Sequence, residues 1–168
     1  MPTNIEIIFT TSQSLISRLI RWVTRSPVSH AAIGGFSLAG VEVFLHADVG
    51  GVQVTPKAHF FADRQPYAVF RVKDEVIHNL SDAVRDIGER YDYLGLVGHL
   101  IRTVTRYLGW AIKRPLTSPR AVVCSEFVAR LNLASFATLD PEKTTPKDLL
   151  AVCLASSELE QIFPAKRA

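Results

Sequence analysis

The strongest constraint on the fold is a series of short β-type segments in the first half of the chain. Residues 5–9 (IEIIF) form an apolar run rich in β-branched residues, as buried strands do. Further segments of this kind are His30 to Phe36, Val41 to Ala47, Val52 to Thr55 and Tyr67 to Val72. Glycines punctuate the middle of this region, as they do turns between paired strands. The pattern predicts an antiparallel sheet.

Helical patterns accompany this sheet and dominate the second half of the chain. Ser12 is predicted to cap a helix that runs to about Arg25, and Pro56 to open a short helical turn. Later helices are predicted over 76–90, over most of 93–112, from Cys124 onward and from Pro146 onward. Strands gathered first and helices second predict an α+β fold.

Composition narrows the class of protein. A chain of 168 residues that is 48% hydrophobic is sized for a single domain over residues 1–168. Two cysteines exclude a disulfide framework and a four-cysteine zinc site. The N-terminus lacks the features of a signal peptide, and no run of about 18 apolar residues predicts a membrane span. A cytoplasmic protein is therefore expected.

Cys124 is the strongest single candidate for a catalytic residue. The short apolar run 121–123 precedes it and a helical pattern follows, so its sulfur is expected at the first turn of a helix. Unpaired N–H groups there favour a thiolate and can stabilise an oxyanion. The alternative is a small buried apolar side chain. Cys153, in an apolar stretch, is expected in the core.

Two histidines are candidate partners of this cysteine. His30 opens a predicted strand beside small residues and can project into a cleft, or it is simply a solvated residue at a strand end. His46 lies within a strand whose alternation puts Phe44, His46 and Asp48 on one face. It either orients the first imidazole or is a hydrogen-bonded core residue. The histidines lack the spacing of a metal site, so neither a metal nor a cofactor is expected.

The order of motifs resembles that of a known family. Ser29-His30-Ala31-Ala32-Ile33-Gly34 comes first, then Leu45-His46-Ala47, Tyr91-Asp92-Tyr93, Val123-Cys124-Ser125-Glu126-Phe127-Val128 and Thr145-Pro146-Lys147-Asp148-Leu149. This resembles the circularly permuted papain-like cysteine hydrolases of the NlpC type, the YiiX-like and YaeF-like proteins. These are similar in turn to lecithin–retinol acyltransferase-like enzymes. The resemblance covers about residues 5 to 150.

The resemblance implies both a fold and a set of roles. The fold is a small antiparallel, barrel-like sheet packed against helices, with Cys124 facing His30. Cys124 is the nucleophile, His30 its general base and His46 the third polar residue, although Asp48 on the same face is an alternative orienter. Tyr91 assists the backbone N–H of the cysteine in binding the oxyanion; from the residues alone it is equally a packing tyrosine.

These expectations lead to a cysteine hydrolase or acyltransferase that forms a thioester on Cys124. Its substrate would be a peptide, a peptidoglycan fragment or an acyl lipid, so both peptidase (thiol protease) or amidase activity and acyl transfer remain open. The alternatives are a non-catalytic lipid- or peptide-binding module that retains the fold, or a structural partner in a phage or host assembly.

The distribution of basic residues along the chain indicates which kinds of binding partner to expect. The stretch 93–120 carries basic residues and no acid, and Arg18, Arg21 and Arg25 line a helix near Trp22. Peripheral contact with a membrane through 93–120 is therefore one possibility, and arginines at the rim of a core helix are the other. Nucleotide-binding motifs are absent from the sequence, and nucleic acid is not an expected partner.

Overall fold

The computed structural model describes residues 5–48, 51–73, 124–131 and 133–163. Its strands are β1 (Glu6–Ser12), β2 (His30–Leu38), β3 (Val41–Asp48), β4 (Gly51–Pro56), β5 (Arg64–Val72) and β6 (Leu159–Phe163). Its helices are α1 (Leu15–Thr24), α2 (Lys57–Phe60), α5 (Cys124–Ala129) and α6 (Pro146–Ala155), with 3-10 turns η2 (Ala134–Phe136) and η3 (Pro141–Lys143). The α+β class predicted from the sequence is confirmed.

The described strands form one antiparallel sheet in the order β4-β3-β2-β1-β5-β6. Strand β1 pairs with β2 on one side and β5 on the other, and its residues Ile7, Ile8 and Phe9 are all buried. Because consecutive residues of a strand point to opposite faces, this burial requires cover on both faces.

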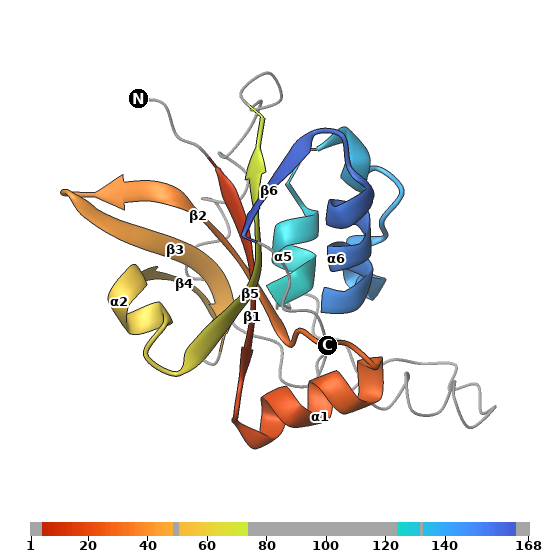
Figure 1. Ribbon diagram of the computed structural model, residues 1–168, viewed down its shortest axis with the longest axis horizontal. Helices are drawn as coiled ribbons and strands as arrows, with labels where there is room; N and C mark the ends of the chain where they lie inside the picture. Colours follow the sequence, from red (N-terminus) through yellow and green to blue (C-terminus); the bar gives the residue numbers. More distant parts are fainter. Residues whose placement is uncertain (1–4, 49–50, 74–123, 132, 164–168) are drawn as a thin grey trace.

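A different apolar cluster covers each face of the sheet. Ile7 and Phe9 belong to the main apolar cluster, which includes residues of α5 and α6, such as Phe127 and Leu149. Ile8 belongs to a smaller cluster with Ala32, Phe44 and Phe60. Figure 1 shows α5 and α6 on one side of β1 and β5, and α2 on the other. The sheet is therefore the middle layer of the described structure.

The sheet is open, which corrects the barrel-like form expected from the sequence. Among the described residues, β4 and β6 are its two edges. Strand β6 itself was not predicted from the sequence, because only Leu159 of its five residues is buried. An exposed edge strand lacks the apolar pattern by which strands are recognised.

Local sequence explains where the helices begin. Ser14, and not the predicted Ser12, caps α1: its hydroxyl accepts a hydrogen bond from the Ser17 N–H at 3.1 Å. Helix α6 starts at Pro146 as predicted, and Thr145 and Asp148 form a capping box.

The predicted helices over 76–90 and 93–112 lie outside the described residues. In the part of the chain that is described, no helix is long and apolar enough to cross a membrane.

A pair of glycines shapes β2 where its pairing with β3 changes register. The shift falls between Ile33 and Phe36, and Gly35 has a φ of 90° there. A bulge at this position needs a residue that adopts positive φ readily. A Cβ on the neighbouring Gly34 would lie 2.5 Å from Phe44 Cε1 and 2.7 Å from Ile8 Cδ1. The second apolar cluster therefore closes directly over Gly34.

This contact predicts the effect of one added methyl group. Gly34→Ala should lower the free energy of unfolding by about 2 kcal/mol, because Phe44 and Ile8 must move. Urea denaturation followed by circular dichroism measures the loss. Ser37→Ala, at an exposed position of the same strand, is the control and should change stability by less than about 0.5 kcal/mol. Equal effects of the two substitutions would contradict the close packing at Gly34.

Candidate functional site

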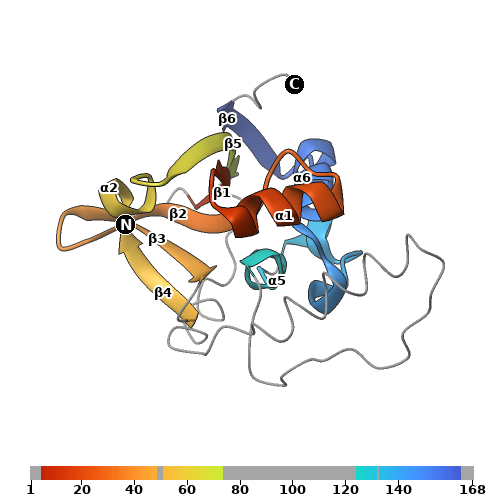
Figure 2. The same cartoon turned by 90° about the horizontal axis from the view of Figure 1, so that it is seen from below.

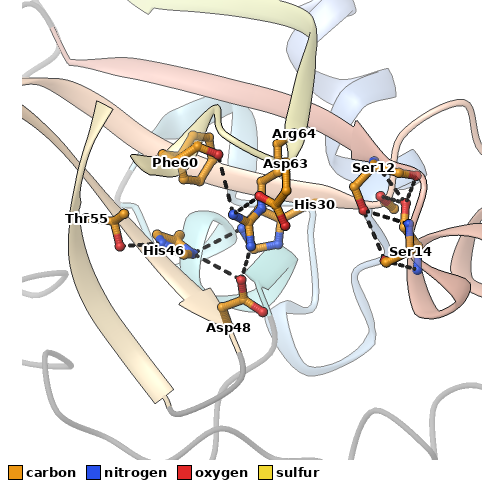
Figure 3. A network of polar contacts seen from close by, with 11 residues as sticks. Ser12, Ser14, His30, His46, Asp48, Thr55, Phe60, Asp63 and Arg64 are labelled. Carbon is orange, nitrogen blue, oxygen red and sulfur yellow. Dashed lines mark hydrogen bonds and ion pairs between the residues drawn. The ribbon is translucent and has the colours of Figure 1, made fainter. Parts of the chain in front are cut away.

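Strand pairing brings two histidines into contact. His30 is the first residue of β2 and His46 lies near the end of β3. His30 Nε2 is 3.2 Å from His46 Nδ1, and the two rings meet edge to face with centroids 5.2 Å apart. Both rings also pack against Phe60, which is fully buried. Figure 3 shows the pair between Thr55 and Asp48.

Thr55 on β4 occupies the other nitrogen of His46. Its hydroxyl Oγ1 lies 2.9 Å from His46 Nε2. A neutral imidazole has one donor and one acceptor nitrogen. The directions of the two hydrogen bonds that join His30, His46 and Thr55 therefore depend on each other. If Thr55 accepts from His46, then His46 accepts from His30 Nε2–H. In that state His30 Nδ1 keeps a free lone pair and can accept a proton.

A pair of opposite charges lies beside these rings. Asp48 Oδ2 is 3.9 Å from His46 Nδ1 and forms an ion pair with Arg64. The Arg64 guanidinium also contacts Asp63 at 3.0 Å and lies 5.1 Å from the centre of the Phe60 ring (Figure 3). Arg64 thus balances the charge of Asp48 in a half-buried position. This role was not predicted from the sequence, in which Arg64 lies three residues before the predicted strand Tyr67 to Val72.

Ligand atoms of His30, His46 and Asp48 lie within 4.8 Å of one another. The residue types would suit a divalent cation, and this grouping was not anticipated from the spacing of the histidines. However, the Arg64 guanidinium already neutralises the Asp48 carboxylate. We therefore interpret the cluster as a hydrogen-bonded histidine pair rather than a metal centre.

Cys124 is the first residue of α5, a helix whose described side chains are all buried. Phe127 and Val128 hold it in the main core, and it packs against β2 and β3 (Figure 2). The Ser125 hydroxyl donates to the Thr144 carbonyl at 2.6 Å and fixes the start of the helix. Cys124 is therefore held rigidly, and it is 3% exposed.

The Cys124 sulfur lies near the first residues of β2, which pair with β1 but not with β3. It accepts a hydrogen bond from the backbone N–H of Ala31, the residue after His30. Pairing of β2 with β3 starts at Ile33 and Leu45 and continues away from this end, so Ala31 lies beyond it. The sulfur therefore meets the backbone at the start of β2 from the face that the main apolar cluster covers.

The site therefore differs in one respect from the sequence expectation that Cys124 faces His30. The ring of His30 packs with His46 and Phe60, whereas Cys124 belongs to the cluster on the opposite face. Among the described residues, the hydrogen bond of the His30 ring goes to His46 and that of the sulfur to backbone. Tyr91, the remaining predicted site residue, lies outside the described residues.

Burial sets the protonation of these groups. It raises the pKa of the Cys124 thiol to about 11; the Asp48 charge adds to this, while the Ala31 N–H opposes it. Burial, together with His46 and Arg64, holds the pKa of His30 well below its usual value, although part of the residue reaches solvent. Burial lowers the pKa of His46 to about 4 against the pull of Asp48. At neutral pH the thiol and both imidazoles are uncharged.

Cys153 provides a contrast within the same protein. It is buried in the main core, as expected from its apolar surroundings, and burial alone raises its pKa to about 12. Both cysteines are free thiols. Only Cys124 has backbone N–H groups that lower its pKa, from Ala31, Ser125 and its own amide.

The histidine pair predicts a specific loss of stability in acid. The unfolded chain binds protons on its histidines near pH 6.5, whereas His46 in the folded protein has a pKa of about 4. Stability should therefore fall by about 3 kcal/mol as the pH drops through this window. Urea titrations between pH 7 and 4 measure it. His46→Gln should flatten the slope and the exposed-site control His59→Gln should not; an unchanged slope in His46→Gln would contradict the assignment.

Sequence comparisons find no protein-family model and no curated protein that matches the chain. Its function is therefore inferred from the described residues, namely a buried thiol near the start of β2 and a hydrogen-bonded histidine pair whose first member opens that strand.

Proposed function

We propose that the protein is a cysteine-dependent hydrolase or acyltransferase that cleaves an amide or ester through a thioester on Cys124. One observation carries the proposal: the sulfur accepts the Ala31 N–H, one residue from a histidine that is hydrogen-bonded to a second histidine. Cysteine hydrolases combine such a thiol with an oriented imidazole.

The proposed reaction starts from neutral partners. His30 Nδ1 takes the proton from Sγ as the sulfur attacks the substrate carbonyl carbon. Backbone N–H groups around the sulfur donate to the oxyanion of the tetrahedral intermediate. His30 then gives the proton to the leaving amine or alcohol, which departs and leaves the thioester. Water or a second acceptor, deprotonated by His30, attacks the thioester and releases the acyl product, and the proton returns to the sulfur.

This mechanism requires the His30 ring to turn toward the sulfur. β2 is not paired with β3 at His30, so no neighbouring strand lies against it on that side. Before the turn, His46 and Thr55 set the proton on Nε2, so that Nδ1 reaches the sulfur as the base. His46 is the orienting residue in this proposal, since Asp48 is committed to Arg64.

The motif order also supports the proposal that the fold is of the permuted papain-like type. His30 precedes Cys124 in the chain, a helix begins at the cysteine, and that helix packs on an antiparallel sheet. Under this proposal the substrate is a peptide, a peptidoglycan fragment or an acyl lipid.

A non-catalytic lipid- or peptide-binding module is the second candidate. The observation that favours it is the burial of Cys124, whose thiol has a pKa raised to about 11 and therefore holds its proton at rest. In such a module the histidine pair would stabilise the fold without transferring a proton. Thiol reactivity separates the two candidates.

The first test compares the two cysteines of the chain. Iodoacetamide at neutral pH should alkylate Cys124 faster than Cys153, since only Cys124 lies near the start of β2, from which the proposed base His30 can turn toward the sulfur. His30→Gln should slow the reaction of Cys124 about tenfold or more, because the general base is lost. Peptide mass spectrometry gives both rates from one sample. Equal slow rates, or no effect of His30→Gln in a variant with an unchanged melting temperature, would support the binding module instead.

The second test addresses the proton on His30. Thr55→Val removes the partner of His46 Nε2 and should slow alkylation of Cys124 severalfold, while Thr55→Ser should restore it, because the hydroxyl decides which nitrogen of each ring carries hydrogen. Thr11→Val is the matched control, since the Thr11 hydroxyl has no hydrogen-bond partner among the described residues. If Thr55→Val and Thr11→Val behave alike, Thr55 has no positioning role.

A further inference from the structure

Helix α1 presents an apolar row to solvent instead of to the core. Leu15, Leu19 and Trp22 are 79%, 46% and 74% exposed. Their spacing of four and three residues places them on one face of the helix. Amphipathic helices of globular proteins normally bury this face, yet the buried residues of α1 are Ser17 and Val23. The part of the chain that the structure describes therefore leaves this row uncovered.

The orientation of α1 is fixed by polar contacts with the body of the protein. The hydroxyls of Ser17 and Ser29 lie 2.6 Å apart in a buried position. Ser17 Oγ also donates to the Ser12 carbonyl at 2.9 Å and accepts from the Ser12 N–H at 3.1 Å. Rolling the apolar row inward would break these bonds. Figures 1 and 2 show α1 at the periphery of the described structure.

Positive charge accompanies the apolar row. Trp22 follows Arg18 by four residues, so the two side chains are neighbours on the helix surface, and Arg25 is the C-cap residue at the end of the helix. No aspartate or glutamate occurs in the sequence between Glu6 and Glu42. The surface thus combines leucines, a tryptophan and the positive charge of Arg18. This combination is typical of helices that lie in the interface of an anionic bilayer.

We propose that α1 docks on the surface of an anionic phospholipid bilayer. Leu15, Leu19 and Trp22 enter the boundary of the acyl chains, and Arg18 faces the headgroup phosphates. The inference goes beyond the proposed function, because the surface exists whether or not Cys124 reacts. It also differs from the sequence expectation, which put membrane contact in 93–120, a range outside the described residues. Because Ser29 precedes His30, the docked helix is tied directly to the start of β2.

Vesicle binding tests the proposal. The full chain is sedimented with phosphatidylcholine vesicles that contain or lack phosphatidylserine. It should bind the anionic vesicles, and added salt should weaken binding. Arg18→Gln should lower the partition coefficient roughly fivefold. The double variant Leu15→Ser/Trp22→Ser should lower it about tenfold or more. Leu38→Ser is the matched control, since Leu38 is 66% exposed at the far end of β2, and its binding should be unchanged.

A second measurement keeps the test independent of expression or folding. In a Trp110→Phe background, Trp22 is the remaining tryptophan, and its fluorescence should shift to shorter wavelength on anionic vesicles.

Several outcomes would overturn the proposal. These are equal binding to neutral vesicles, an equal loss in Leu38→Ser, or no spectral shift. A large drop in melting temperature of Leu15→Ser/Trp22→Ser without vesicle binding would mean that the protein itself covers the row. A dimer abolished by that variant would mean that a second copy does.

Discussion

The burial of β1 on both faces is the constraint from which the rest of the described structure follows. Ile7, Ile8 and Phe9 are consecutive and inaccessible to water, so apolar material must lie above and below the strand. Helices α5 and α6 supply one layer, and the Phe44 and Phe60 rings supply the other. A chain with this strand at its centre must distribute its reactive side chains between two separate layers.

This division explains the position of the candidate site. Cys124 comes from the helical layer, while His30 and His46 pack in the aromatic layer with Phe60. Within a continuous sheet the backbone would separate such groups. At the start of β2, however, pairing with β3 has not begun, so that the N–H of Ala31, the residue next to His30, is available to the sulfur. A histidine further along β2 would lack this access, which gives the first position of the strand its significance.

Much of the fold could be predicted from the sequence, because alternation and turn residues act locally. The segments that became β2, β3 and β4, the turn after Pro56 and the helix at Pro146 are confirmed. The faces of β3 were also predicted, with Leu45 and Ala47 on one side and Phe44 and His46 on the other. β6 was missed because edge strands carry little apolar pattern.

The partners within the site could not be predicted in the same way. Contact between His30 and His46 follows from β2 lying beside β3, which a sequence read locally only suggests. Thr55 reaches His46 from the next strand, although Gln53 is the residue directly opposite, so this contact depends on side-chain direction. Arg64 neutralises Asp48 across a separation of sixteen residues. Such pairings depend on register and not on composition.

The raised pKa of the Cys124 thiol has a consequence for the lifetime of the protein. Peroxides attack thiolates, and a thiol whose pKa is about 11 contains very little thiolate at neutral pH. Because the sulfur is also enclosed, oxidation to sulfenic acid is suppressed for as long as the site is at rest. A cell under oxidative stress would therefore retain this protein in its reduced form, and sensitivity to oxidants would arise only while the sulfur is being deprotonated.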